Sequence, residues 1–320
     1  MKLDKSPAFY ALIAGSIVAG SFVFAPIAQA SSGIRSKGFP SNHVHVASPL
    51  TRVANVVYTV KLEDQLLALL RYLPVSFQTR TAVSTTTTTT TTDPTTTTTT
   101  DPTTTSTFSS PTTTTTLPVA TTIPISDPTK LQNGTYVWRF RTLPTSIRQL
   151  WRVGTDNVIL QGALMSFQVA NNLTTTGSMN PATWHALVKA AVNKRVDPQA
   201  YNYVYVRQTL PELLKLYVNG RIAYETYVNT GISAAPTQAG TYPVFQRFLT
   251  TTMSGVEPDG TPYSDPGIPW VSYFHGGDAL HGFIRSSYGY PQSLGCVEMP
   301  FAHAAILFPH TPIGTLVTVQ

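Results

Sequence analysis

Hydrophobic and polar residues alternate along most of the C-terminal third of the chain. The segments YNYVYVRQ, LLKLYVNGRIAYETYVNTG and GTYPVFQRF have the two-residue period of strands with one buried face. Asn219 and Gly220 separate two of these runs and are typical of a hairpin turn. GTLVTVQ predicts a last strand at the C-terminus. We therefore predict that residues 201–320 are mostly β, with long loops rich in glycine and proline that hold the chemistry.

Hydrophobic residues recur at helical spacing in two earlier parts of the chain. The segment LEDQLLALLRYLPVSF, which starts at Leu62, predicts a short amphipathic helix that is stopped by Pro74. Farther on, the pattern predicts two more helices around a polar turn, the second of which starts at Asn180-Pro181. The inward positions of these two helices are Leu160, Leu164, Phe167, Trp184 and Leu187. We predict that these two helices form a small bundle.

A threonine-rich stretch lies between the first helical segment and the other two. It reads STTTTTTTTDPTTTTTTDPTTTSTFSSPTTTTTLP and has almost no apolar side chains to bury. Such a segment cannot offset the entropy of ordering its backbone, and its prolines oppose helix formation. We predict that residues 84–127 are disordered.

The N-terminus has the composition of a targeting segment. Two lysines precede an apolar stretch from Phe9 to Phe24, and Ala28-Gln29-Ala30 supplies the pattern that signal peptidase cleaves. We predict a signal peptide at residues 1–30 and an exported protein. An uncleaved membrane anchor is the alternative, since the uncharged run approaches the roughly 20 residues of a spanning helix. Residues 31–55 stay unassigned.

The charge of the chain says little about its partners. The net charge is +6, only 11% of the residues are charged, and no cluster of five lysines or arginines occurs. A nucleic-acid-binding protein needs a concentrated basic stripe, so we expect no nucleic-acid partner. Mild basicity is compatible with an anionic polymer as partner.

Cys296 is the only cysteine in the chain and lies in the segment SLGCVEM. In an exported protein a leftover cysteine is either an intermolecular link or a free reactive thiol. A nucleophilic thiol needs an imidazole nearby, and His275 and His281 precede it in WVSYFHGGDALHGFIRSSYGYPQSLGC. Gly295 lets the backbone approach a substrate carbonyl closely, so amides near Cys296 are candidate oxyanion donors.

Other interpretations of these residues stay open. A lone cysteine is often a small buried hydrophobe. Zinc bound by His275, His281 and Cys296 is a second alternative, although the paired spacing of zinc sites is absent. Either histidine alone is also compatible with a hydrogen-bonded structural role.

The same stretch resembles the catalytic core of the L,D-transpeptidase (YkuD-like) family. The matching positions are His281-Gly282, Gly289-Tyr290-Pro291 and Ser293-Leu294-Gly295-Cys296. Upstream, the Pro-Thr-x-x-Gly-x-Tyr element at Pro236 to Tyr242 is similar to the family's entry strands. The resemblance implies a YkuD-like β-sandwich or barrel with long loops as the catalytic domain, over residues 198–320.

Two positions depart from the family's pattern. The family commonly has histidine where Leu294 stands, and arginine or asparagine where Glu298 stands. Neither position is the nucleophile or the base, so we expect retained chemistry with altered substrate contacts. An acidic neighbour nevertheless disfavours a thiolate, so low activity is the alternative expectation for Glu298.

The helical segments resemble small three-helix peptidoglycan-binding domains. The matching positions are Phe167-Gln168, Leu173, Gly177 and Pro181-Ala182-Thr183-Trp184. The helix at 62–73 is similar to the first helix of that module. The resemblance therefore implies one α-helical domain built from residues 56–83 and 128–195, with residues 84–127 as an insertion; an interdomain linker is the alternative.

The resemblance to the catalytic family implies a double displacement on peptidoglycan stem peptides. Cys296 is the implied nucleophile, His281 its base, and the Gly282 carbonyl the group that orients the imidazole. Gly295 and Cys296 would bind the oxyanion, and the further candidates for oxyanion or substrate contacts are Tyr263, Tyr273, His275 and Ser293. For Tyr263 a packing role, and for Ser293 a turn-capping role, are the alternatives.

These expectations leave three functions to separate. A donor and an acceptor stem make the protein a transpeptidase, whereas water as acceptor makes it an L,D-carboxypeptidase or endopeptidase with the same residues. The third function is a non-catalytic, wall-binding one. No cofactor and no metal are expected, the protein is expected at the cell wall, and a membrane is a partner only if the N-terminal segment is uncleaved.

Overall fold

The computed structural model describes residues 52–53, 56–79, 127 and 130–320. The predicted signal peptide at 1–30 lies outside the described residues. So do nearly all of the unassigned segment 31–55 and all of the threonine-rich segment 84–127 except Asp127. Within the described part of the chain, no helix is both long enough and apolar enough to span a bilayer.

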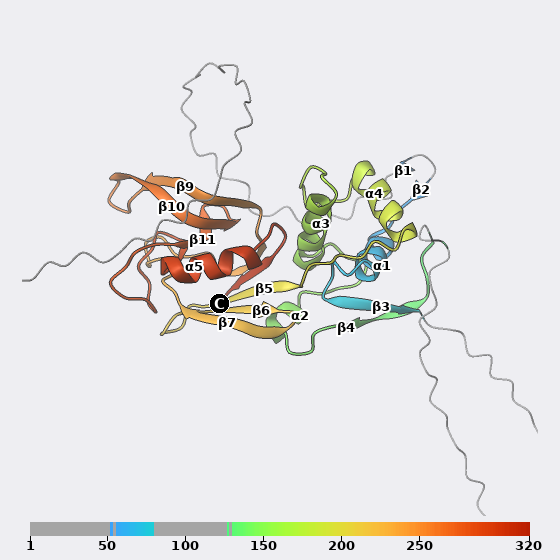
Figure 1. Cartoon of the computed structure of the whole chain (residues 1–320), viewed down its shortest axis with the longest axis horizontal. Coiled ribbons are helices and arrows are strands. Elements are labelled where there is room, and N and C mark those ends of the chain that lie inside the picture. Colours follow the sequence, from blue (N-terminus) through green and yellow to red (C-terminus); the bar gives the residue numbers. More distant parts are fainter. Residues whose placement is uncertain (1–51, 54–55, 80–126, 128–129) are drawn as a thin grey trace, which may run out of the picture. The chain divides into compact units, whose positions relative to one another are not determined.

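The C-terminal part is built on two sheets (Figure 1). The five-stranded sheet has the order β7 (Arg221–Tyr227), β6 (Leu213–Val218), β5 (Asn202–Arg207), β13 (Leu316–Val319) and β8 (Gly240–Pro243). The four-stranded sheet has the order β12 (Val297–Met299), β11 (Asp278–Gly282), β10 (Pro262–His275) and β9 (Gln246–Val256). The expected mainly β domain is confirmed.

One buried cluster joins the two sheets. It contains Val204 and Leu216 of the five-stranded sheet together with Phe274, Leu280 and Val297 of the four-stranded sheet. Helix α5 (Phe301–Leu307), followed by the 3₁₀ turn η1 (Phe308–His310), adds Ala304 and Leu307 to the cluster. Burial of these apolar side chains, worth about 1.5–3 kcal/mol each, holds the strands that carry the motif residues in place.

The predicted hairpin turn is confirmed. Asn219 and Gly220 connect β6 to β7 with φ angles of 48° and 79°, the left-handed conformations that a two-residue turn of this kind requires. GTYPVFQRF, by contrast, does not form one strand. It divides between β8 and β9, which belong to different sheets.

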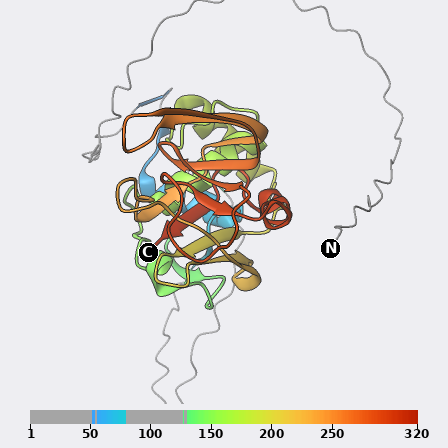
Figure 2. The same ribbon diagram turned by 90° about the vertical axis from the view of Figure 1, so that its left-hand side faces the viewer.

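A long loop was expected in the glycine- and proline-rich part of this domain. Much of that part instead forms strand β10, which makes a long hairpin with β9. Figure 2 shows this long hairpin in orange. Prolines are tolerated in β10 because its first half pairs only with β9, and pairing with β11 starts at Ser272. A break in register between Asp265 and Ile268 coincides with Gly267, whose φ is +76°.

Helix α1 (Val60–Leu69) ends earlier than the predicted stop at Pro74. Arg71 adopts a φ of 70°, the Tyr72 N–H donates to the Leu67 carbonyl, and the Arg71 N–H donates to the Ala68 carbonyl. This pair of bonds satisfies carbonyls that the helix end leaves open. The left-handed residue therefore ends the helix, and the proline lies beyond it.

The other helical elements follow after residue 130. Strand β3 (Val75–Thr79) pairs antiparallel with β4 (Gly134–Trp138), so the two ends of the intervening segment meet. Asn157 and Asn180 cap the N-termini of α3 (Val158–Ala170) and α4 (Pro181–Val192) with their side-chain oxygens. The remaining short elements are β1 (Arg52–Val53), β2 (Val56–Val57) and α2 (Thr145–Arg148).

The helices pack around one buried apolar cluster. Leu66, Leu160, Phe167, Trp184 and Leu187 are each at most 1% exposed within it. The assignment of this region as a peptidoglycan-binding module stays a prediction.

Candidate active site

His281 lies on strand β11 and is 2% exposed. The chemistry was expected in loops, and this placement corrects that expectation: burial on a strand fixes the imidazole more firmly than a loop would. Nδ1 lies 3.0 Å from the carbonyl oxygen of Gly282. A carbonyl only accepts hydrogen bonds, so Nδ1 carries the proton and Nε2 keeps its lone pair.

Cys296 immediately precedes β12, the strand that pairs in parallel with β11. This pairing puts His281 opposite Glu298, two residues after the cysteine. The sulfur is half-buried, and its S–H donates to the carbonyl of Gly277 over 3.6 Å. Strand pairing therefore brings together two motif residues that are 15 positions apart in the sequence.

A tight turn presents the thiol. Ser293 is 1% exposed, and its hydroxyl donates to the Cys296 carbonyl over 2.5 Å and accepts the Gly295 N–H over 3.2 Å. Gly295 has a φ of +115°, and a Cβ there would lie 2.6 Å from Oδ1 of Asp278. The position thus requires glycine for both its conformation and its space.

A cavity of about 770 Å³ is lined by both Cys296 and His281. Tyr263 and Tyr273, which the sequence analysis named as candidate substrate contacts, also line it, and so does Leu294. His275, Gly282, Ser293 and Gly295 do not belong to its lining. The cavity therefore unites the candidate nucleophile, the candidate base and both tyrosine candidates.

His275 has a different environment from the one expected of a cleft residue. Its ring packs against Tyr242 with centroids 4.4 Å apart, and its Nδ1 lies 3.6 Å from Oδ2 of Asp278. Among the residues that the structure describes, no group of three or more His, Cys, Asp and Glu side chains is arranged to hold a metal ion. The alternative of zinc bound by both histidines and the cysteine thus finds no support in this geometry.

The electrostatics favour a neutral thiol and a neutral imidazole at rest. Burial raises the pKa of the Cys296 thiol to about 12; a backbone hydrogen bond from Ala279 opposes this, and the carboxylates of Asp278 and Glu298 add to it. Burial also lowers the pKa of His281, against the opposing effects of the Gly282 carbonyl and Glu298. The imidazole is therefore free to accept a proton in the neutral pH range.

Two tyrosines face this thiol. Burial raises the pKa of Tyr263 and of Tyr273, and the charge of a Cys296 thiolate raises both further. Both phenols therefore keep their protons at neutral pH, and a protonated phenol can donate a hydrogen bond.

Sequence reasoning missed Asp278 and Arg285. Oδ2 of Asp278 accepts the Gln238 N–H over 3.0 Å, which ties the entry of β11 to the Pro236–Tyr242 element. Arg285 forms two hydrogen bonds with Glu298, the position whose acidity was expected to weaken the site. An arginine between the His-Gly and Gly-Cys motifs was the available signal, because a buried carboxylate needs a cationic partner.

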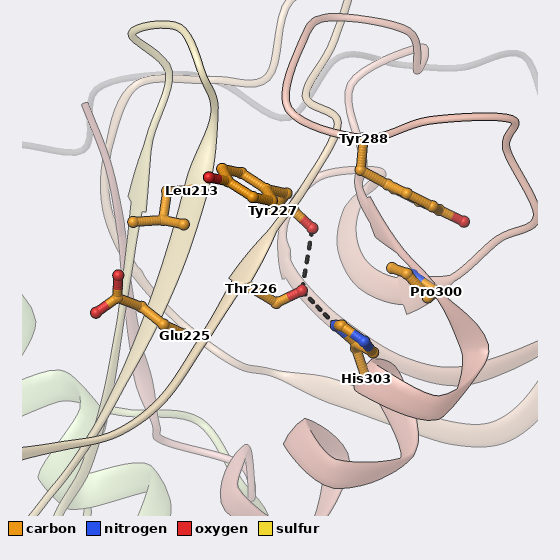
Figure 3. A pocket seen from close by; sticks show the side chains of 7 residues that line it. All are labelled: Leu213, Glu225, Thr226, Tyr227, Tyr288, Pro300 and His303. Atoms are coloured by element: carbon orange, nitrogen blue, oxygen red, sulfur yellow. Dashed lines mark hydrogen bonds between the residues drawn. The ribbon is translucent and has the colours of Figure 1, made fainter.

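A second hollow, of about 420 Å³, lies beside α5 (Figure 3). The Thr226 hydroxyl forms a hydrogen bond with Nδ1 of His303 and donates to the Tyr227 carbonyl over 3.2 Å. The lining residues are Leu213, Glu225, Thr226, Tyr227, Tyr288, Pro300 and His303. Neither Cys296 nor His281 lines it.

Comparison with known proteins adds to this geometry. Residues 201–319 match the family model described as the L,D-transpeptidase catalytic domain, YkuD. No curated protein matches the chain.

Several of the similar solved structures are L,D-transpeptidases. The catalytic domain of an E. faecium L,D-transpeptidase is 28% identical over 37% of this chain and 96% of its own, with a TM-score of 0.34. An L,D-transpeptidase from Mycobacterium smegmatis is 19% identical over 38% of this chain, also with a TM-score of 0.34. The present chain spans 59% of the length of that protein.

The family model covers both motif residues and every strand of the two large sheets. Residues 201–319 therefore carry a YkuD-type L,D-transpeptidase catalytic domain.

Proposed function

We propose that this protein is an exported, cysteine-dependent L,D-transpeptidase that cross-links peptidoglycan stem peptides through a thioester. The observation that carries the proposal is the shared cavity of Cys296 and His281, with Nδ1 of His281 bonded to the Gly282 carbonyl. The general-base nitrogen Nε2 then stays available for the thiol proton.

The first displacement acylates the enzyme. Nε2 of His281 takes the thiol proton as the sulfur attacks the amide carbonyl between the third and fourth residues of a donor stem. The new S–C bond forms, the C–N bond breaks, and the imidazolium returns its proton to the leaving amine of the terminal D-alanine. Because thiol and imidazole are both neutral at rest, proton transfer accompanies the attack.

Backbone amides of the cysteine turn are the proposed oxyanion donors. The Gly295 N–H donates to the Ser293 hydroxyl in the resting structure, so its use requires that bond to lengthen. The Cys296 N–H and the Tyr263 phenol are the other proposed donors.

The second displacement transfers the acyl group. An amine of a neighbouring stem attacks the thioester carbonyl and gives its proton to Nε2 of His281. The C–S bond breaks, the sulfur takes the proton back, and a new amide joins the stems. The thioester conserves the energy of the original amide, so the reaction needs no nucleotide.

The helical region is proposed to bind peptidoglycan and thereby hold the catalytic domain at its substrate. Support comes from the resemblance of Phe167-Gln168 and Pro181–Trp184 to such modules. Co-sedimentation of the full-length Cys296→Ala variant with insoluble peptidoglycan tests this without turnover. A protein that stays in the supernatant contradicts it.

Incubation of the full-length protein with a defined tetrapeptide donor tests the catalytic proposal. Mass spectrometry should detect a thioester on Cys296 and release of D-alanine, and a cross-linked product once an acceptor stem is added. Cys296→Ala and His281→Asn should abolish both, while Arg221→Gln, an exposed arginine on β7, serves as control. Tripeptide as the sole product with acceptor present identifies a hydrolase instead, and unchanged cross-linking by Cys296→Ala rules out the mechanism.

A further inference from the structure

Arg285 contacts three separate parts of the candidate active site. It follows β11 by three residues, and its side chain is 30% exposed. Nε donates to Oε2 of Glu298 over 2.7 Å, and an Nη2 hydrogen donates to Oε1 over 2.8 Å. This two-point geometry is the strongest form of an arginine–carboxylate pair and fixes both side chains.

The partner carboxylate is buried on the strand of the nucleophile. Glu298 is 4% exposed, lies two residues after Cys296, and is paired in register with His281. A carboxylate in such a place needs a cation, because an unpaired buried charge is costly. The hydrogen bonds to Glu298 in turn raise the pKa of Arg285, which keeps the guanidinium charged.

The same guanidinium also holds the loop that leads to the thiol. Nη2 donates to the Gln292 carbonyl over 3.3 Å, one residue before the turn-forming Ser293. Its carbon lies 4.6 Å from the ring centroid of Phe283, and that ring meets the His281 imidazole edge-on at 6.0 Å between centroids. Contacts therefore run from one arginine to both the cysteine turn and the base.

The site's other polar side chains do not duplicate this arrangement. Asn229 binds the backbone of Ser287 and Gly289 in the middle of the loop, but it is uncharged. Arg285 is the only arginine or lysine that lines the cavity among the described residues. A neutral substitute can keep some of its contacts but cannot neutralise Glu298.

We propose that Arg285 is a positioning residue for Cys296: paired with Glu298, bonded to the Gln292 carbonyl and packed on Phe283, it holds the cysteine turn beside His281 and cancels the buried charge. This inference rests on the proposed function only where kcat for donor acylation is measured. Glu298, which was expected to weaken the site, would then form an ion pair without net charge together with Arg285.

The variants Arg285→Gln, Arg285→Lys and Glu298→Gln and the exchange Arg285→Glu with Glu298→Arg separate positioning from simple support. We expect Arg285→Gln to lower kcat for donor acylation by about 10-fold to 100-fold with KM little changed, since displacement of a nucleophile by about 1 Å costs about 100-fold. The exchange should recover only part of that loss, because it restores an opposite-charge pair but neither the donation to the Gln292 carbonyl nor the packing on Phe283. Arg221→Gln is the matched control.

Alkylation of the Cys296 thiol by iodoacetamide needs no substrate. Its rate is followed from roughly pH 6 to 10, on the rising limb of the profile below the raised thiol pKa, where a shift appears as a changed rate at each pH. We expect Arg285→Gln to shift the alkylation profile to higher pH, because the unpaired Glu298 charge opposes the thiolate, and Glu298→Gln to shift it to lower pH. A purely structural residue would lower the melting temperature without moving these profiles in opposite directions. If Arg285→Gln does not fold, Arg285→Lys, which keeps the charge and loses the two-point contact, should show the kcat loss without the profile shift.

Two results would overturn the proposal. One is a folded Arg285→Gln variant with unchanged kcat and an unchanged alkylation profile. The other is a rise in KM alone, which would make Arg285 a substrate-binding residue. Failure of the proposed function is distinct, since it would appear as transpeptidation that survives Cys296→Ala.

Discussion

The Nδ1–H of His281 donates to the carbonyl oxygen of Gly282 over 3.0 Å, and both residues belong to the same buried strand. The bond fixes the tautomer of the imidazole without a carboxylate. A carbonyl holds the ring in place but adds no full negative charge. Burial lowers the imidazole pKa and the Gly282 carbonyl opposes this only in part, which suits a base that works from its neutral form.

The pH dependence of acylation should reflect this low pKa. We expect the rate of thioester formation to fall in acid with an apparent pKa below 6.5, the ordinary value for histidine, because burial lowers the pKa of His281. Above that pH the rate should level off, since the thiol pKa is raised to about 12 and His281 accepts the proton directly. Quenched-flow mass spectrometry of the acyl-enzyme measures the profile. A rate that rises about 10-fold per pH unit through neutrality would instead indicate attack by a free thiolate.

Two glycines near the thiol should respond differently to the same substitution. In Gly295→Ala the new Cβ meets Oδ1 of Asp278 at 2.6 Å, and the φ of +115° is strained for alanine. We expect a loss of stability of about 2 kcal/mol and strongly reduced alkylation of Cys296. A Cβ at Gly277 has no heavy atom within 4 Å, so Gly277→Ala leaves the space beside the thiol open. Gly260→Ala, at a φ of +89° with no heavy atom within 4 Å of its Cβ, is the control for backbone strain alone. Equal melting temperatures and equal thiol reactivity in the Gly295→Ala and Gly277→Ala variants would refute the role assigned to the turn.

Ser293 should affect both the stability of the turn and the rate of acylation. Ser293→Ala removes the hydroxyl that bridges the Gly295 N–H and the Cys296 carbonyl, two bonds worth about 1 kcal/mol each. We expect about a 10-fold lower rate of thioester formation, because the thiol is then less well oriented. Kinetics of acylation at saturating donor measure this effect, with Ser286→Ala, an exposed serine, as control. An unchanged rate would show that backbone bonds alone hold the turn.

The helical region should lose stability in alkaline solution. Burial raises the pKa of Glu63 to about 8 and that of Asp64 to about 7, from 4.5 and 3.8. The folded state thus binds these protons more tightly than the unfolded state. The stabilisation is complete below the unfolded pKa values and is lost as the pH rises through about 7 and about 8.

Thermal unfolding of the full chain at several pH values measures this effect. Glu63→Gln should raise the melting temperature at alkaline pH by a few degrees, as about 1 kcal/mol corresponds to about 2–4 °C. Glu225→Gln, at a side chain that is 44% exposed, should leave it nearly unchanged. A melting temperature of the wild type that rises with pH would contradict the sign of the prediction.

Local patterns in the sequence were sufficient for several features of the fold. The alternation after Tyr201 predicted the strands of the five-stranded sheet, because a half-buried strand requires that period. Asn219-Gly220 predicted a hairpin, because both residues tolerate left-handed backbone. The lone cysteine after a glycine, with a His-Gly pair upstream, was sufficient to select the cavity's nucleophile and base as candidates.

Other features depend on contacts between distant parts of the chain. The parallel pairing of β11 with β12 sets His281 beside the cysteine strand, and no pattern within either strand specifies that partner. Likewise the proline-rich stretch became strand β10, because its first half is hydrogen-bonded on one side only. Propensity disfavours such a strand, and tertiary pairing overrides it.

The sequence by itself determined which residue types are available for the chemistry and where the local elements form. Only the tertiary structure decided that Glu298 forms an ion pair with Arg285 and that His275 turns to Tyr242 and Asp278. The physical reason is that the energy of a charge or an imidazole depends on burial and on its nearest neighbours. Those neighbours are set by strand pairing and packing across the whole domain.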